Sequence, residues 1–299
     1  IRIIYMSHMK ANFLMLIASL IWGTAFVSQT TGMGFIGPFT FSFARFFLAA
    51  LTVLPLALYF EKQNFEIFFK NKNFIYLSLF AGLALFGGMG LQQYALLKSQ
   101  IANASFLSTL YVPIVSLISR FIFKSRLHWI VWIAVLLCIY GSYLLSSNQA
   151  LEIQRSDSLL FIAAVCFAIH IILIDVFMKQ FYSPFTFGFI QYAVVFLCST
   201  ILAFSFETPT LANIKLEWFE LIYTGVASAG IGYTLQIIAQ SKASPAPAAI
   251  ILSMESVFGT IAGWILINQV LDTNKILGCI AIFIGVIIVQ LIPIYTNKK

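Results

Sequence analysis

The sequence predicts an all-α membrane protein with ten transmembrane helices, arranged as two inverted five-helix repeats. Three observations support this prediction. Of the 299 residues, 61% are hydrophobic and only 9% are charged, whereas soluble domains carry about 25% charged residues. Long stretches without any charge follow one another along the chain, and the second half of the chain repeats parts of the first half.

The charge-free stretches define the expected helices. They cover residues 11–44, 73–97, 99–119, 127–151, 180–206 and 276–297. A membrane-spanning helix needs about 20 mainly apolar residues, and these segments lack the alternation of barrel strands. In chain order we expect helices at about 11–31, 39–60, 74–96, 101–122, 128–147, 158–178, 185–206, 219–240, 247–267 and 275–296. The loops between them are short, so we expect no soluble domain.

The basic residues predict the orientation of these helices. With a cytoplasmic N-terminus, the inner side holds twelve of them: Arg2, Lys10, Lys62, Lys70, Lys72, Arg120, Lys124, Arg126, Lys179, Lys242, Lys298 and Lys299. The outer side holds four: Lys98, Arg155, Lys215 and Lys275. This excess follows the positive-inside rule, so both termini are predicted to be cytoplasmic. The net charge of +7 therefore reports orientation, and we expect no nucleic-acid partner.

The second and the seventh expected helices begin with nearly the same sequence. "PFTFSFARF" at 38–46 returns as "PFTFGFIQY" at 184–192, an offset of 146 residues. Further along, an offset of 144 places Gln92 on Gln236 and Tyr111 on Glu255. The matches continue as far as Gly141 on Gly285, in the fifth helix of each half. The chain is therefore predicted to be two five-helix units, residues 1–150 and 151–299.

Five helices per unit is an odd number, so the second unit must enter the membrane from the opposite side. Lys98 and Lys242 are equivalent in the repeat, yet they fall on opposite sides in the topology above. Inverted repeats are typical of secondary transporters, whose substrate site lies near the membrane midplane between the two repeats.

Several segments along the whole chain resemble the drug/metabolite transporter superfamily, specifically its EamA-type exporters. They are "SLIWGTAF" (19–26), the Pro…Ala-Arg-Phe of 38–46, "GLQQYALLKSQIANASFLSTLYVPIVSLI" (90–118) and "GYTLQIIAQSKASPAPAAIILSMESVFGTIAGWILI" (232–267). The resemblance implies a ten-helix basket-like bundle with a central cavity. It also implies export of amino acids or similar small metabolites across a bacterial inner membrane, without naming the substrate.

The sequence departs from the family pattern at two places. The acidic residue common at the end of the fourth and ninth helices is replaced near Ser125 and Gln269. The Glu-Pro pair that members often carry in the ninth helix reads Glu255-Ser256 here. The carboxylate is kept, but a helix-breaking proline is absent.

Four ionisable residues lie inside the expected helices, where such residues are functional candidates: Arg45, His170, Asp175 and Glu255. Asp175 is expected to pair locally with Lys179, four residues later. His170 could bind substrate or hydrogen-bond a neighbouring helix. The two do not share a helix face, because five residues turn the helix by about 500°.

Glu255 is the strongest candidate, since it lies about 12 Å along the ninth helix in a hydrocarbon core about 30 Å thick. It could carry a coupling proton, pair with a substrate ammonium group, or form a structural interhelical hydrogen bond. Arg45 lies about 10 Å below the outer end of the second helix. It could reach the headgroups or clamp a carboxylate bidentately.

Five further polar or aromatic residues could complete a substrate cavity, although packing between helices would also explain each of them. They are Trp22, Gln92, Tyr94, Tyr111 and Gln236. Together with Arg45, His170 and Glu255 they form the predicted substrate-binding set. Arg45 or His170 would orient a carboxylate, and Glu255 an ammonium group or a proton.

Secondary transport is the function that these patterns favour. A channel or a non-transporting scaffold is the alternative, although no filter-like glycine motif or acidic ring supports a channel. An intramembrane enzyme is disfavoured: "VASAG" around Ser228 lacks the first glycine of G-x-S-x-G, and no H-E-x-x-H is present. We expect no catalytic residue, metal or cofactor, and no nucleotide-binding motif is found.

Overall fold

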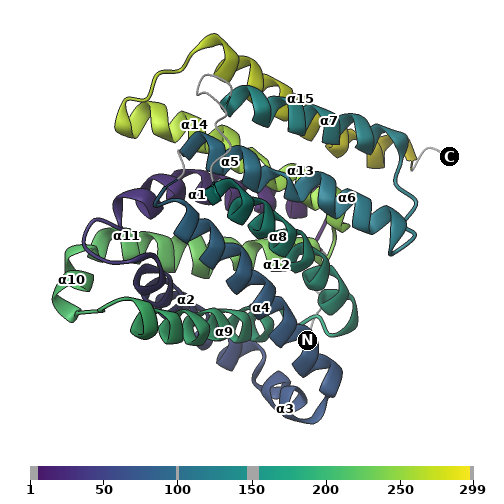
Figure 1. Cartoon of the computed structure of the whole chain (residues 1–299). Helices are drawn as coiled ribbons and strands as arrows, with labels where there is room; N and C mark the ends of the chain where they lie inside the picture. The colour runs from purple at the N-terminus through teal and green to yellow at the C-terminus, as the bar shows by residue number, and fades with distance from the viewer. Residues whose placement is uncertain (1–5, 99–100, 147–154, 297–299) are drawn as a thin grey trace.

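The computed structural model describes residues 6–98, 101–146 and 155–296, and within these ranges every regular element is a helix. The first half contains α1 (His8–Thr31), α2 (Pro38–Phe60), α3 (Lys62–Lys70), α4 (Lys72–Ala95), α5 (Ile101–Thr109), α6 (Tyr111–Phe121) and α7 (Trp129–Ser146). The second half contains α8 (Arg155–Gln180), α9 (Pro184–Phe206), α10 (Leu211–Leu216), α11 (Trp218–Ile222), the π-helix η1 (Tyr223–Gly232), α12 (Tyr233–Gln240), α13 (Pro245–Leu252), α14 (Met254–Ile267) and α15 (Thr273–Thr296). Figure 1 shows them packed as one bundle.

Nine helical stretches of the described residues are long and apolar enough to cross a membrane. They correspond to nine of the ten predicted helices. The remaining one, expected at 101–122, is interrupted at Leu110 between α5 and α6 and includes a shorter apolar stretch, Phe106–Phe121. The predicted all-α membrane fold is thus confirmed, with nine to ten spans.

Two short helices were not predicted, and some predicted features lie outside the described residues. The short helices α3 and α10 follow α2 and α9 where the sequence suggested only loops. The predicted boundary at residues 150 and 151 lies outside the described residues, as do Arg2, Lys298 and Lys299.

The two halves pack mainly against each other. α2 lies along α9, α7 along α15, α4 along α8, and α1 along α14. The first two of these pairs join helices that are equivalent in the repeat. The largest apolar cluster accordingly draws on both halves, from Ala11 and Met15 in α1 to Ile282 and Val286 in α15.

Two glutamates tie α2 and α9 together at opposite ends. At one end, the Glu207 carboxylate accepts from the backbone N–H groups of Phe39 (2.9 Å) and Thr40 (2.8 Å) and from the Thr40 hydroxyl (2.5 Å). The carboxylate sits where the first turn of α2 leaves its N–H groups unpaired, so it caps that helix.

At the other end, the Glu61 carboxylate accepts from the N–H groups of Phe185 (3.3 Å) and Thr186 (2.8 Å) and from the Ser183 hydroxyl (2.7 Å). Glu61 and Glu207 are 146 residues apart, the offset of the two "PFTF" segments. Each helix thus ends beside the start of its repeat partner, so α2 and α9 run antiparallel, as an inverted repeat requires.

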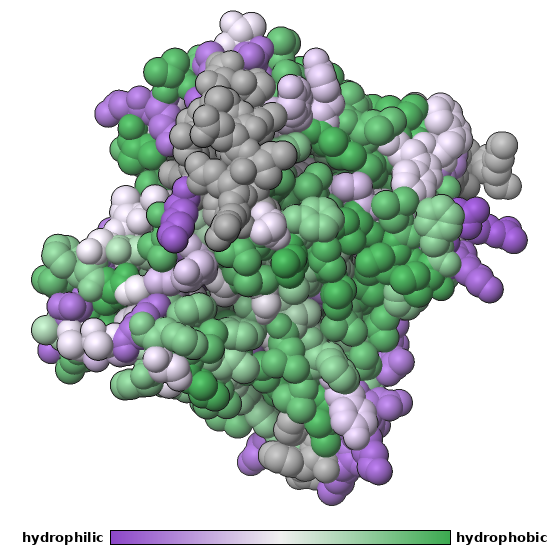
Figure 2. Space-filling model, viewed as in Figure 1, coloured by the Kyte–Doolittle hydropathy of each residue, from purple (hydrophilic) through white to green (hydrophobic). Residues whose placement is uncertain are grey.

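The surface fits a membrane environment. Large apolar side chains are exposed on most of the long helices, among them Phe13, Leu58, Phe80, Leu136, Ile201, Phe204 and Ile265. Figure 2 shows hydrophobic side chains over most of the visible face, with hydrophilic ones gathered towards its edges. A lipid bilayer is the solvent in which such a surface is stable.

Candidate functional site

A pocket lies between the two halves, in the interior of the bundle. Its lining comes from α1, α2, α4 and α6 of the first half and from α8, η1, α12, α13 and α14 of the second half. The lining residues are Trp22, Phe26, Gln29, Arg45, Met89, Gln92, Tyr111, Phe167, His170, Ile171, Ser228, Tyr233, Gln236, Leu252 and Glu255. The space open to water within it is about 50 Å³, which is room for a few water molecules.

α1 presents one face to this pocket. Trp22, Phe26 and Gln29 follow the i, i+4, i+7 spacing, which places them above one another on a helix. The Trp22 indole N–H donates to the backbone oxygen of Ser228 (3.0 Å), and its ring centroid lies 4.6 Å from that of Tyr233. These contacts join α1 to η1 and α12, so the wall of the pocket is shared between the repeats.

The π-helix η1 brings backbone oxygens to the pocket. Its wider turn packs close against α2 because Gly225 has no side chain. A Cβ at Gly225 would come within 2.8 Å of Leu48 Cβ and 2.9 Å of the Arg45 backbone oxygen. Such π-helical turns are frequent at functional sites. Here the turn holds Thr224 and Ser228 beside the Arg45 side chain.

Arg45 is only 2% exposed, and its hydrogen-bond partners in the described part of the chain are neutral. Nε donates to the backbone oxygen of Thr224 (3.2 Å), Nη1 to Gln29 Oε1 (3.1 Å) and Nη2 to Ser228 Oγ (2.9 Å). A guanidinium group has five N–H donors, so two remain. Within the described residues it makes no ion pair, and a buried cation without a counter-ion is a candidate anion site.

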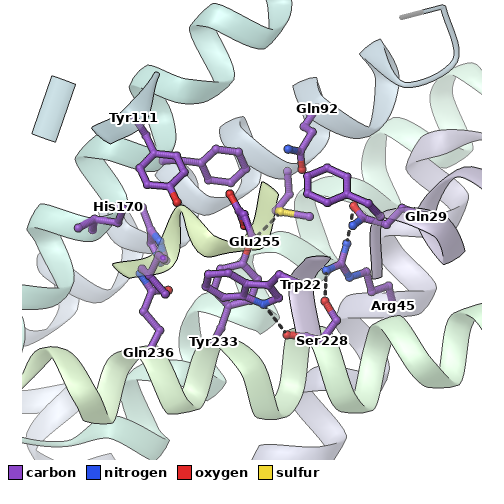
Figure 3. Close-up of a pocket in the computed structure, with 15 residues that line it drawn as sticks. Trp22, Gln29, Arg45, Gln92, Tyr111, His170, Ser228, Tyr233, Gln236 and Glu255 are labelled. Atoms are coloured by element: carbon purple, nitrogen blue, oxygen red, sulfur yellow. Dashed lines mark hydrogen bonds between the residues drawn. The ribbon is translucent and has the colours of Figure 1, made fainter. Parts of the chain in front are cut away.

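Glu255 and Tyr111 enter the pocket just after interruptions in their helices. Tyr111 is the first residue of α6, and Glu255 is the second residue of α14. Glu255 is 9% exposed, and Figure 3 shows the Tyr111 hydroxyl turned towards it. These two residues are equivalent in the repeat, so the axis relating the halves passes near them.

His170 is held by a residue outside the pocket. Its Nε2 lies 2.5 Å from Gln191 Oε1, and Gln191 Nε2 donates to the backbone oxygen of Phe187 (3.2 Å). Gln191 stands at the position that Arg45 occupies in the first half. The charge of the first copy is thus replaced by an amide that orients a histidine in the second.

The two equivalent glutamines both reach the pocket but bond differently. Gln92 Nε2 donates to Ser108 Oγ (2.8 Å), whereas Gln236 Nε2 donates to Gln240 Oε1 (2.9 Å). Gln240 Nε2 in turn donates to the backbone oxygen of Ile171 (3.0 Å). Gln236 Oε1 is left buried without a hydrogen-bond partner in the described part of the chain.

Of the eight residues in the predicted substrate-binding set, the structure brings seven together around this pocket. The exception is Tyr94, which is 40% exposed and stacks on Phe39 with ring centroids 6.1 Å apart. It lies two residues after Gln92, and two residues turn an α-helix by about 200°. Tyr94 therefore faces away from the pocket. Asp175 also lies outside the lining and pairs with Lys179 at 2.8 Å, as predicted.

Several lining residues were not predicted. Gln29 could have been found from its i, i+7 spacing to Trp22, and Tyr233 from its position three residues before Gln236. Ser228 was considered only as a nucleophile, whereas in the structure its hydroxyl oxygen accepts a hydrogen bond from Arg45 Nη2 (2.9 Å). The described residues contain no group of three or more His, Cys, Asp or Glu side chains that could hold a metal ion.

The model of the EamA-like transporter family matches the chain twice, over residues 9–147 and 154–291. The chain belongs to the EamA-like transporter family. The two matches correspond to the two repeats, and the resemblance seen in the sequence to the drug/metabolite transporter superfamily is confirmed.

Two relatives of this EamA-family chain carry transporter names. An uncharacterized transporter of Archaeoglobus fulgidus is 28% identical over 276 residues, which cover 92% of this chain and 84% of the relative. The uncharacterized transporter YoaV of Bacillus subtilis is 23% identical over 279 residues, covering 90% and 92%. A protein crystal structure that is 17% identical superposes with a TM-score of 0.79 over 96% of this chain and 98% of that one. This last similarity concerns the fold alone.

Proposed function

We propose that this protein is a secondary transporter that exports amino acids or related small metabolites by alternating access. The observation that carries the proposal is that Arg45 and Glu255 line the same pocket. A cation and a carboxylate thus line the same cavity, and within the described residues the hydrogen-bond partners of Arg45 are neutral. A zwitterion offers a carboxylate to the first and an ammonium group to the second.

The size of the pocket supports alternating access. About 50 Å³ open to water is small for an amino acid, so the pocket has to widen before a substrate enters. An inverted repeat provides a way to widen it from either side, because the two halves can exchange conformations around a fixed site.

We also propose that the protein lies in a bacterial inner membrane with both termini in the cytoplasm. The excess of basic residues on one side of the expected helices supports this orientation. Glu255 either binds the ammonium group of the substrate or carries a proton that is exchanged for it. The two roles are compatible within one cycle, because proton and ammonium would compete for the same carboxylate.

Release from proteoliposomes tests this function. Vesicles containing the protein are loaded with an equimolar mixture of the twenty amino acids, and the released compounds are measured by mass spectrometry. We expect selective release of one amino acid or a small group, and little release with Arg45→Gln or Glu255→Gln. Lys215→Gln, in exposed α10, is the matched control and should behave as the wild type.

Two results would overturn the proposal. Release that depends only on molecular size would indicate a channel. Release no faster than from loaded vesicles without protein would indicate a non-transporting scaffold or a different substrate class. The direction is tested in cells, where expression of the protein should lower the internal level of the released amino acid.

A further inference from the structure

The orientation of the Gln191 amide is fixed by a backbone carbonyl. The Phe187 oxygen can only accept a hydrogen bond, so the group that faces it at 3.2 Å must be the amide nitrogen of Gln191. The amide oxygen of Gln191 therefore faces His170, and Nε2 of His170, 2.5 Å away, must be the donor. The tautomer of His170 is thus assigned from this chain of hydrogen bonds.

The remaining nitrogen of His170 is then an acceptor. The ring is 1% exposed and its recorded partner is an uncharged amide, so the neutral form is favoured over a buried imidazolium. A neutral imidazole that donates through Nε2 carries a lone pair on Nδ1. His170 lines the pocket, and its Nε2 is turned to Gln191, which lies outside the lining. Nδ1 is therefore the ring nitrogen left for the site, and the ring does not offer a positive charge.

A second chain of amides ends in the same way. The Ile171 oxygen accepts from Gln240 Nε2, so Gln240 Oε1 faces Gln236 and accepts from its Nε2. Gln236 Oε1 is the end of this chain, and it is buried without a partner within the described ranges. An unsatisfied buried carbonyl oxygen in a pocket lining needs a donor from a ligand or a water molecule.

The pocket is thus divided by hydrogen-bond polarity. Figure 3 shows His170, Gln236 and Tyr111 on one side of the view and Arg45 with Gln29 on the other, with Glu255 between them. The side with Arg45 offers unpaired N–H donors. The other side offers three acceptors, His170 Nδ1, Gln236 Oε1 and the Glu255 carboxylate, together with the Tyr111 hydroxyl, which is buried without a hydrogen-bond partner within the described ranges.

We propose that His170, Gln236 and Glu255 form a subsite for a primary ammonium group, and that Gln191 and Gln240 are positioning residues that keep its acceptors turned into the pocket. An ammonium group has three N–H donors, which matches three acceptors from three helices. This inference rests on the proposed function, which it makes more specific. It assigns the substrate carboxylate to Arg45 and removes His170 as a ligand for it.

The repeat explains how such a polar pocket arises from two similar halves. Arg45 and Gln191 occupy equivalent positions in α2 and α9. The arginine gives the first half a donor, and the glutamine gives the second half an oriented acceptor through His170. A zwitterion therefore has one preferred direction of binding in an otherwise symmetric fold.

The first test observes the histidine without any substrate. Full-length protein in lipid nanodiscs is labelled with ¹⁵N-histidine, and the His170 signals are assigned by their loss in His170→Asn. We expect the wild type to show a single tautomer with the proton on Nε2. Gln191→Leu should show a mixture of both tautomers, because the acceptor that holds the proton on Nε2 is lost. A wild-type proton on Nδ1, or two tautomers in the wild type, would overturn the inference.

The second test measures binding of three matched probes by the shift in thermal unfolding: L-leucine, 4-methylpentanoate, which lacks the amine, and 3-methylbutylamine, which lacks the carboxylate. We expect the affinity for leucine and for the amine to fall roughly tenfold in Gln191→Leu and in Gln240→Leu, because one charge-assisted hydrogen bond is lost. The affinity for 4-methylpentanoate should not change, and Gln290→Leu on α15 is the control.

The outcomes separate this inference from the proposed function. If the amine binds and depends on Gln191 but no amino acid is released from proteoliposomes, the ammonium subsite stands and transport of amino acids fails. If the variants weaken all three probes equally, or weaken none, the ammonium subsite is wrong even where transport is observed.

Discussion

The reciprocal caps at the ends of α2 and α9 lead to a prediction of stability. In Glu207→Gln the side chain keeps its shape, but one carboxylate oxygen becomes an NH₂ group. That group cannot accept, so it faces the N–H of Phe39 or Thr40 as donor against donor. The same substitution at Glu61 affects Phe185 and Thr186 in the same way.

The magnitude follows from the bonds that are lost. A hydrogen bond to a charged group contributes about 1.5–3 kcal/mol, and the attraction between a carboxylate and a helix N-terminus adds about 0.3–1 kcal/mol. Losing one such bond and the charge predicts a cost of about 2–4 kcal/mol for each variant. For a chain of this size, that corresponds to a fall in Tm of roughly 5 °C.

The two caps should act independently. They lie at opposite ends of a 23-residue helix, which spans about 34 Å, and distant substitutions are usually additive. The double variant should therefore lose about twice as much as either single variant.

A thiol-reactive fluorescent dye provides the assay, because the four cysteines, Cys138, Cys166, Cys198 and Cys279, all lie in helices of the bundle. Unfolding in detergent exposes them. The control is Glu220→Gln in α11, whose carboxylate makes no hydrogen bond or ion pair within the described part of the chain. Unfolding curves for Glu61→Gln and Glu207→Gln that coincide with the control would refute the capping argument, and a large effect at only one site would refute its symmetry.

Three further predictions concern the pocket and its walls. Glu255→Gln should abolish the response of transport to an imposed pH gradient while the protein stays folded; a retained response would remove Glu255 as a proton carrier. Arg45→Lys should weaken binding of carboxylate-bearing substrates at least tenfold in a binding titration, since the planar fork that reaches Thr224, Gln29 and Ser228 is lost; wild-type affinity would show that Arg45 only anchors α2. Gly225→Ala should destabilise the protein by about 1–3 kcal/mol, because the new Cβ would lie 2.8 Å from Leu48 Cβ. In the same dye assay, Gly87→Ala should lower the free energy of unfolding by less, because its new Cβ would meet the flexible thiol of Cys166 at 2.9 Å.

Much of the fold could be predicted from the sequence, because lipid imposes a simple rule. Each spanning segment must be apolar and must satisfy its own backbone hydrogen bonds, so hydropathy locates the helices. The repeat then determines which helices are equivalent. Neither signal could locate the π-helical turn of η1 or the interruption at Leu110, because these depend on close packing against other helices.

The pocket was predicted less completely, and the reasons are geometric. Arg45, His170 and Glu255 were found because charged or titratable groups are rare in such helices. Gln191 and Gln240 were not found, since each acts through a neighbour and neither lines the pocket. The reciprocal caps were missed although Glu61 and Glu207 share the offset of "PFTF". A carboxylate at the end of one helix gives no sign of which helix start it will meet.

The repeated segments at 38–46 and 184–192 have both a shared and a distinct role in the structure. The Pro-Phe-Thr turn of each is the start of a helix that the other repeat caps. The arginine that faces α1 and η1 in one copy is replaced by an oriented amide in the other. The shared part of the segments serves the fold, and the differing part gives the pocket its polarity.

The central claim is that a zwitterion is carried by alternating access through the pocket between the repeats. Counterflow tests it most directly: proteoliposomes are loaded with an unlabelled amino acid that the protein releases, and uptake of the same amino acid in labelled form is followed. We predict that internal substrate accelerates uptake several-fold and that Arg45→Gln removes the acceleration. Uptake that does not depend on internal substrate would contradict alternating access.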